Sequence, residues 1–131
     1  MVARVLVVDD DEDLRRLVER HLQKAGHRVA GAATAEQALA LIDERGTPDL
    51  AVLDVAMPGL SGLELLDTLR DREATADLPA IFLSARVQQH DIEAGEARNA
   101  LYLTKPFVAS ALLSAVDRLL AGSEEESART W

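Results

Sequence analysis

The sequence predicts an α/β domain built as a three-layer sandwich, in which helices cover both faces of a five-stranded parallel sheet. Five short apolar runs alternate along the chain with stretches of helical periodicity. Two of these runs, at residues 5–8 and 50–53, end abruptly in the carboxylates of Asp9, Asp10 and Asp54. Unbroken apolar runs are typical of parallel strands buried on both faces, and ligands bind beyond the carboxyl ends of such strands. We therefore expect the three aspartates to meet at one edge of the sheet.

The strands are expected where β-branched and other apolar residues gather between turn signals. They are predicted near residues 5–8, 28–31, 50–53, 80–83 and 101–103. Periodicity alone does not give their order in the sheet.

The first helix is predicted between the first two strands, because apolar residues recur there at steps of three and four. Its apolar face is expected to consist of Leu14, Leu17, Val18, Leu22 and Ala25. Gly26 is expected to end this helix, since glycine readily adopts the backbone conformation that follows a last helical turn.

Two further helices begin with the pattern of a capping box, in which the side chains of the first and fourth residues each accept a hydrogen bond from the other's backbone amide. The pattern occurs at Thr34 with Gln37 and at Ser61 with Glu64. The expected apolar faces are Ala35, Ala38, Leu39 and Ile42 in one helix and Leu65, Leu66 and Leu69 in the other.

A fourth helix is predicted over residues 87–98, and a last one after Pro106 and Phe107. The last helix is expected to face inward through Leu112, Leu113, Val116, Leu119 and Leu120. Residues 1–121 then form the domain, and the polar residues 122–131 form a tail that we expect to be disordered.

Composition excludes several classes of function. A chain of 131 residues has room for one domain, and its 48% hydrophobic residues are ample for a core. No cysteine is present, so disulfides, thiolate metal sites and thiol catalysis are excluded; we expect a cytoplasmic protein. The net charge of −9 argues against direct nucleic-acid binding. No run approaches the roughly 20 apolar residues of a membrane span.

The aspartates are the first candidates for chemistry. Two carboxylates about 4 Å apart repel each other by roughly 4 kcal/mol at an effective dielectric constant of 20. Such a cluster recruits a hard divalent cation, and Mg²⁺ prefers oxygen ligands of this kind. An aspartate beside the ion can also attack phosphorus and form an aspartyl-phosphate. For Asp11, Glu12 and Asp13 we prefer a structural interpretation, in which they favour the positive end of a helix dipole.

Two more candidates follow the fourth and fifth strands. Ser84 ends one apolar run, and the small Ala85 after it leaves room for a bulky group. Lys105 follows the other run and can hold an anion as a point charge. Alone, each has an ordinary explanation as a helix cap or a surface residue, but beside the aspartates both become site candidates.

These residues occur in motifs that resemble those of the response-regulator receiver domain, the phosphoacceptor module of two-component signalling. The resemblance covers about residues 3–121. Its motifs are Val7-Val8-Asp9-Asp10, then Leu53-Asp54 with Met57-Pro58-Gly59 and Gly62, then Ser84-Ala85, and finally Lys105-Pro106-Phe107.

The resemblance implies a flavodoxin-like fold of five βα units with strand order 2-1-3-4-5. It also implies that Asp54 is phosphorylated. Asp10, Asp54 and the backbone carbonyl of Ala56 would bind Mg²⁺ directly, with Asp9 acting through water, and Mn²⁺ can replace the ion. Ser84 would contact the phosphoryl group and Lys105 would pair with it. The Lys105–Pro106 peptide would be cis.

The resemblance further implies a switch, in which Tyr102 moves inward as Ser84 moves toward the phosphate. The face formed by the fourth helix, fifth strand and last helix would then repack. The expected partners are a sensor histidine kinase or phosphotransfer protein and an unknown downstream protein, with no nucleic acid and no membrane. A phosphorylation-dependent homodimer is left open. The residues Arg98-Asn99-Ala100-Leu101 depart from the family pattern and predict a shortened or re-registered fourth helix.

Other functions remain to be weighed against this one. A receiver fold can act as an interaction module that no longer uses phosphate, although the complete set of site residues argues against it. A magnesium phosphatase of related chemistry needs a second acid two residues after the nucleophile, where this chain has Ala56. We expect no enzyme activity beyond the domain's own phosphorylation and dephosphorylation. The position of Met1 and the short tail favour a stand-alone protein over a piece of a longer regulator.

Overall fold

A five-stranded parallel sheet forms the centre of the molecule in the computed structural model, which describes residues 2–85, 93 and 100–121. The strands lie in the order β2-β1-β3-β4-β5, as the family resemblance implies. Their bounds are β1 Arg4–Val8, β2 Arg28–Ala32, β3 Leu50–Asp54, β4 Ala80–Ser84 and β5 Ala100–Thr104. All five predicted strands are confirmed, and each is one or two residues longer than predicted.

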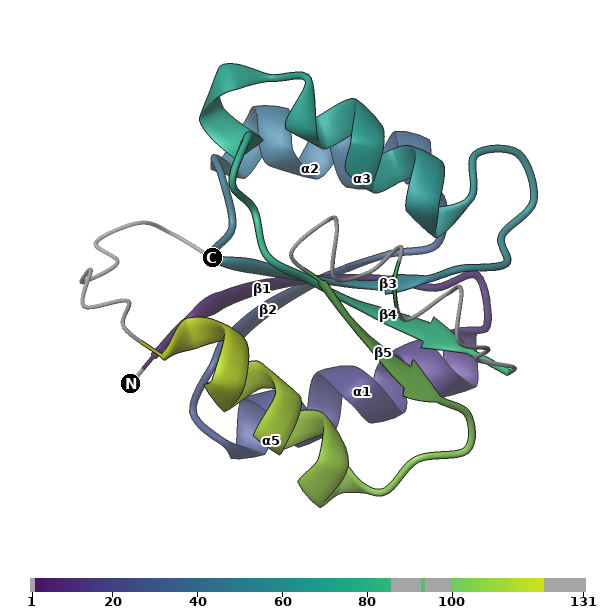
Figure 1. The fold of residues 1–131 in the computed structure, drawn as a ribbon, viewed down its shortest axis with the longest axis vertical. Helices are drawn as coiled ribbons and strands as arrows, with labels where there is room; N and C mark the ends of the chain where they lie inside the picture. The colour runs from purple at the N-terminus through teal and green to yellow at the C-terminus, as the bar shows by residue number, and fades with distance from the viewer. Residues whose placement is uncertain (1, 86–92, 94–99, 122–131) are drawn as a thin grey trace.

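Helices cover both faces of the sheet and complete the three predicted layers (Figure 1). One face carries α1 (Glu12–Lys24) and α5 (Ala109–Leu120), and the other carries α2 (Ala35–Arg45) and α3 (Gly62–Arg70). A short 3₁₀ turn, η1 (Glu73–Thr75), follows α3 and was not predicted. The helix predicted over residues 87–98 lies outside the described residues except for Glu93, and so does the tail at 122–131.

The central strands explain why their sequences are apolar throughout. Every residue of β1 and of β3 is buried. Successive side chains point to opposite faces of a strand. Val5 and Val7 therefore pack with α1 and α5, whereas Leu6 and Val8 pack with α2 and α3. A strand between two helical layers has no wet face, so it shows no polar alternation.

The predicted helix caps are present, with one difference. The Ser61 hydroxyl accepts a hydrogen bond from the amide of Glu64, whose carboxylate accepts one from the Ser61 amide, so this capping box is complete. The Thr34 hydroxyl accepts from the amide of Gln37 at 3.1 Å. The Gln37 side chain, however, accepts from the amide of Ala33 at 2.8 Å instead of that of Thr34.

The predicted apolar face of α1 was too wide. Val18 and Leu22 are fully buried, but Leu17 is 41% exposed, and Ala25 is exposed as well. Leu17 is offset by about 100° around the helix from Val18, which points at the sheet, so it turns toward solvent. Ala25 is the C-cap residue, past the last turn, and Gly26 follows it with a φ of 97°, as expected for the end of this helix.

No helix in the described part of the chain combines the length and the apolar character that a membrane crossing requires.

Candidate functional site

Three carboxylates meet at the carboxyl edge of the sheet, where the sequence predicted them. Asp9 and Asp10 follow β1, and Asp54 is the last residue of β3. Because β1 and β3 are paired so that Val8 lies beside Leu53, the residues that follow reach the same level. One oxygen from each of the three carboxylates lies within 4.8 Å of the others. The sheet therefore gathers acids that are more than 40 residues apart in the sequence.

Asp9 is fully buried, whereas Asp10 beside it is exposed. The Asp9 Oδ1 atom accepts a hydrogen bond from the amide of Asp11 at 2.9 Å. The other oxygen, Oδ2, is buried and has no hydrogen-bond partner among the described residues. Burial raises the pKa of Asp9 to about 6; the hydrogen bond from Asp11 opposes this rise, and the nearby Asp54 adds to it. A buried acid with one orphaned oxygen is poised to receive a cation.

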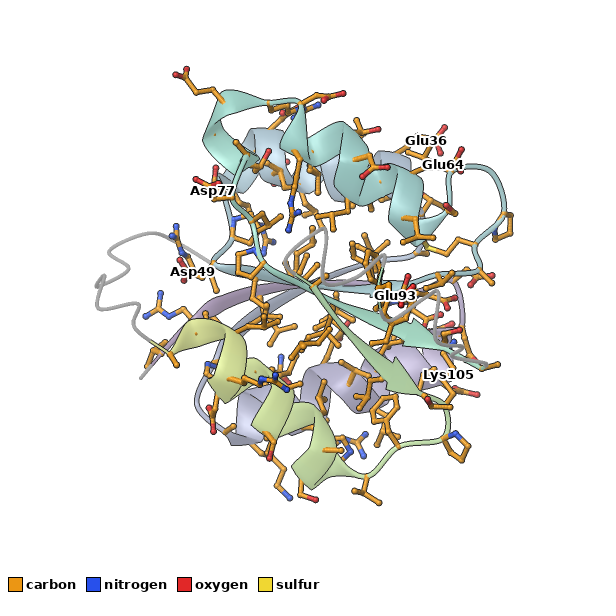
Figure 2. The ribbon with its side chains drawn as sticks, viewed as in Figure 1. Glu36, Asp49, Glu64, Asp77, Glu93 and Lys105 are labelled. Atoms are coloured by element: carbon orange, nitrogen blue, oxygen red, sulfur yellow. The ribbon has the colours of Figure 1, made fainter. Side chains whose placement is uncertain are left out.

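Lys105 is the cation that the protein itself brings to this cluster. Its Nζ lies 3.0 Å from Asp54 Oδ1 and 3.8 Å from Asp9 Oδ2. The backbone amide of Lys105 donates to the carbonyl of Ser84 at 2.7 Å, which ties the end of β5 to that of β4. The Lys105–Pro106 peptide is cis, as expected. Figure 2 shows Lys105 at the carboxyl edge of the sheet, with Asp49 and Asp77 at the opposite edge.

The remaining candidates, Ser84 and Tyr102, lie on β4 and β5. Ser84 is the last residue of β4, is half-buried, and pairs across the sheet with Thr104. Tyr102, in the middle of β5, is also half-buried. Its ring lies 5.1 Å from that of Phe82 at an angle of 41°, so it packs on the α2 and α3 face of the sheet. The sheet thus brings Ser84 to the edge that carries the acids and leaves Tyr102 two residues short of it.

The loop after β3 holds the start of α3 against the end of that strand. The amide of Gly62 donates to the carbonyl of Val55 at 3.2 Å. A Cβ on Gly62 would come within 2.3 Å of the backbone oxygen of Asp54, so only glycine fits this approach. Met57 is buried, whereas Ala56 is exposed. Gly59 turns the loop with a φ of 77°, a conformation that favours glycine.

Arg15 is a residue of the site that the sequence analysis missed. Its Nη1 donates to the backbone carbonyl of Asp9 at 2.9 Å, and its Nε lies 3.6 Å from Glu19 Oε2. The only signal for it in the sequence is an arginine on the first turn of the helix that follows the acids. Such an arginine is ordinarily interpreted as a surface residue.

The donor set fits a divalent cation. Three carboxylates and one ammonium group leave a formal charge of −2, which a divalent ion neutralises. All the donors are oxygen atoms, the type that Mg²⁺ prefers, and Asp9 Oδ2 has no hydrogen-bond partner among the described residues.

Comparison with known proteins shows the family to which this chain belongs. The sequence profile of the response regulator receiver domain matches residues 5–117. This chain belongs to the response-regulator receiver family. The receiver domain resembles the transcriptional regulatory protein AfsQ1 of Streptomyces coelicolor, with 38% identity over 124 residues that cover 94% of this chain and 53% of AfsQ1. It also resembles PrrA of Mycobacterium tuberculosis, with 43% identity over 118 residues that cover 89% of this chain and 49% of PrrA.

Solved structures extend the similarity to the fold. The chemotaxis protein CheY4 of Vibrio cholerae superimposes with a TM-score of 0.83 at 32% identity, covering 92% of this chain and 100% of CheY4. The receiver domain of NtrX from Brucella abortus does so with a TM-score of 0.81 at 35% identity, covering 91% and 99%. The chain spans about half the length of AfsQ1 and PrrA. Sequence and fold together make this chain a two-component receiver domain related to regulatory proteins.

Proposed function

We propose that this receiver domain is a phosphorylatable switch, in which Asp54 accepts a phosphoryl group from the phosphohistidine of a sensor histidine kinase or a phosphotransfer protein. The observation that carries the proposal is the contact of Lys105 Nζ with Asp54 Oδ1 at 3.0 Å beside the carboxylates of Asp9 and Asp10. A carboxylate between a fixed ammonium group and a cation site is arranged to attack phosphorus.

In this proposal Asp10, Asp54 and the backbone carbonyl of Ala56 bind Mg²⁺ directly, Asp9 acts on the ion through water, and Mn²⁺ can replace Mg²⁺. Support comes from the orphaned oxygen of Asp9 and from the charge of −2 that the cluster leaves. When bound, the ion stabilises negative charge on the transferring group and orients it.

The transfer itself makes and breaks one bond to phosphorus. An oxygen of Asp54 bonds to phosphorus while the bond to the donor imidazole nitrogen breaks, and that nitrogen keeps the electron pair. The transition state is loose, with charge spread over the phosphoryl oxygens, so positioning and electrostatics carry the catalysis. The ammonium group of Lys105 offsets that charge, and the hydroxyl of Ser84 donates a hydrogen bond to it.

Phosphorylation then switches the surface of the domain. The new group brings nearly two negative charges and three strong acceptors. Ser84 and Lys105 move toward it, and Tyr102 follows inward beside β4. The face made by α5, β5 and the segment between β4 and β5 repacks and controls a downstream protein. Local charge thus biases an element with two arrangements.

The functional unit in this proposal is residues 1–121, followed by a polar tail. The net charge of −9 of the 131-residue chain favours a protein partner over nucleic acid. The proposal includes no chemistry beyond the domain's own phosphorylation and dephosphorylation, and a homodimer of the phosphorylated form is one way to transmit the signal.

The test is to incubate the protein with acetyl phosphate and Mg²⁺, with and without EDTA, and to follow the intact mass. We expect one metal-dependent phosphoryl adduct that is absent from Asp54→Asn. Labelling of Asp54→Asn would disprove the site. A folded protein that no donor labels, including a kinase, would favour the phosphorylation-independent interaction module.

A further inference from the structure

The backbone of Asp9 is held on both sides, and one of the two holders is a side chain. The Asp9 amide donates to the carbonyl of Ala32 in β2 at 3.1 Å. The Asp9 carbonyl accepts from Nη1 of Arg15 at 2.9 Å. Because a carbonyl belongs to the peptide plane that leads to the next residue, this bond restrains the peptide between Asp9 and Asp10. Arg15 therefore orients the step between the buried acid and the exposed one.

Arg15 is itself held in place by Glu19, one helical turn further along α1. The Arg15 Nε atom lies 3.6 Å from Glu19 Oε2, and both side chains are largely buried, at 17% and 25% exposure. Because the guanidinium group is planar and rigid, a contact that fixes Nε also fixes the direction of the Nη groups. The ion pair thus aims Nη1 at the Asp9 carbonyl.

Gly31 on the edge strand β2 makes room for this arrangement. A Cβ at Gly31 would lie 1.9 Å from Glu19 Oε2, 2.9 Å from Glu19 Cδ and 3.4 Å from Arg15 Cδ. The φ of Gly31 is not in the left-handed region, so the backbone conformation does not require glycine there. The carboxylate of Glu19 occupies the place that a Cβ would take, so a larger residue at this position would have to displace the Glu19 side chain.

We propose that Arg15 is a positioning residue for the metal site, aimed by Glu19 against Gly31, and that it acts by fixing the Asp9–Asp10 peptide. The inference rests on the proposed function, since it concerns the same metal. Outer hydrogen bonds of this kind hold ligands in their bound arrangement, so that binding does not have to order them.

The sign of the effect separates positioning from charge. Arg15 is a cation beside an acidic site. If only its Coulomb repulsion of the ion mattered, removing Arg15 would strengthen the binding of Mg²⁺. The positioning role predicts the opposite. Arg15→Ala is expected to weaken Mg²⁺ binding roughly tenfold, the lower end of what losing such an outer hydrogen bond costs a metal site.

A matched control exists on the same helix. Arg16 pairs with Glu12 at the same spacing of four residues, but its side chain is 67% exposed and that of Glu12 is 57% exposed. Arg16→Ala removes the same charge from the same turn without touching the backbone of Asp9. It is expected to leave the dissociation constant of Mg²⁺ unchanged or slightly lower.

The experiment measures Mg²⁺ binding to the full chain by isothermal titration calorimetry, with thermal unfolding in EDTA to confirm that each variant is folded. Weaker binding in Arg15→Ala and not in Arg16→Ala supports the inference. Equal or tighter binding in Arg15→Ala overturns it. Arg15→Lys, which keeps a donor and loses the fork that pairs with Glu19, is expected to give an intermediate value.

A second variant, Gly31→Ala, tests whether Glu19 positions Arg15 and itself removes no charge. Gly31→Ala displaces the flexible end of Glu19, so it is expected to weaken Mg²⁺ binding by less than Arg15→Ala does. In a Glu19→Ala background the methyl group has no carboxylate to displace, and Gly31→Ala is expected to have no further effect. An equal effect in both backgrounds would overturn the role of Glu19.

Failure of the inference and failure of the proposed function give different results. If the natural chain itself binds no Mg²⁺ and takes no phosphoryl group, the proposed function fails. If it binds the ion and Arg15→Ala binds it equally well, the proposed function stands and only the positioning role is lost.

Discussion

Replacing the buried Asp9 by asparagine should stabilise the metal-free protein at neutral pH. Asp9 is fully buried, and burial raises its pKa from 3.8 to about 6. Asparagine has the same shape and no charge, and its Oδ1 can still accept the hydrogen bond from the amide of Asp11. Its amide group would replace the orphaned Oδ2, which lies 3.8 Å from Lys105 Nζ in the cluster that also holds the Asp54 carboxylate.

The magnitude follows from linkage between protonation and folding. A folded-state pKa about two units above that of the unfolded chain means that the folded protein binds the proton more tightly. The stability of the natural protein therefore falls as the pH rises from about 4 to about 6, and the full cost is reached above pH 6. Two pKa units correspond to about 3 kcal/mol. We expect Asp9→Asn to be more stable by up to about 3 kcal/mol at pH 7.5 and by almost nothing at pH 4.

The assay is urea unfolding in EDTA, followed by circular dichroism, at several values of pH. Asp10→Asn is the control, because Asp10 is exposed and its amide variant should gain little. Mg²⁺ should cancel most of this advantage, since an ion at 100 times its dissociation constant stabilises the natural protein by about 2.7 kcal/mol and should stabilise Asp9→Asn far less. The reasoning is refuted if Asp9→Asn is no more stable at pH 7.5, or if its advantage persists unchanged at pH 4.

Three further changes test other parts of the structure. Burial lowers the pKa of His27, whose Nδ1 accepts a hydrogen bond from the amide of Ala3 at 3.1 Å. As the pH falls, His27 of the unfolded chain therefore takes up a proton at a higher pH than His27 of the folded protein. Its contribution to stability should be complete above about pH 6.5 and be lost as the pH falls below that value. Urea unfolding should therefore show a free energy of unfolding that falls with falling pH in this range, and His27→Gln should reduce that dependence. Gly62→Ala, whose Cβ would meet the backbone oxygen of Asp54, should cost roughly 1–3 kcal/mol and slow labelling by acetyl phosphate; unchanged stability would contradict the close approach. Ser61→Ala should cost about 1 kcal/mol in the same unfolding assay, because it removes the cap of α3.

Much of the fold was readable from local patterns. All five strands were predicted, and no bound differs by more than one residue. The clearest cases are β1 and β3, because a strand buried on both faces must be apolar throughout. The cap at Ser61 was predicted because both halves of its hydrogen bonding lie within four residues. The 3₁₀ turn η1 was missed, since three residues carry no periodicity and the turn is held by a hydrogen bond from Thr75 to the carbonyl of Leu69.

The errors arose where packing overrode a local pattern. Leu17 has the spacing of a core residue, yet it is exposed because the sheet covers only a narrow stripe of α1. Gln37 has the spacing of a capping box, but its side chain bonds the amide of Ala33. Periodicity states which residues could share a face, and only the neighbouring element decides how wide that face is.

The sequence alone determined the fold class and the identity of the acids, because strand ends and carboxylates are local features. It did not determine that Asp9 is buried and Asp10 exposed, since that depends on which layers close over the end of β1. Nor did it show that Arg15 reaches the backbone of Asp9 and that Glu19 rests on Gly31. Lys105 meets Asp54 across 51 residues of chain, a contact that exists only once the strands are in register. Strand order and helix docking bring these charges together and shield Asp9 and Asp54 from water, and the tertiary structure therefore decides how strongly they interact.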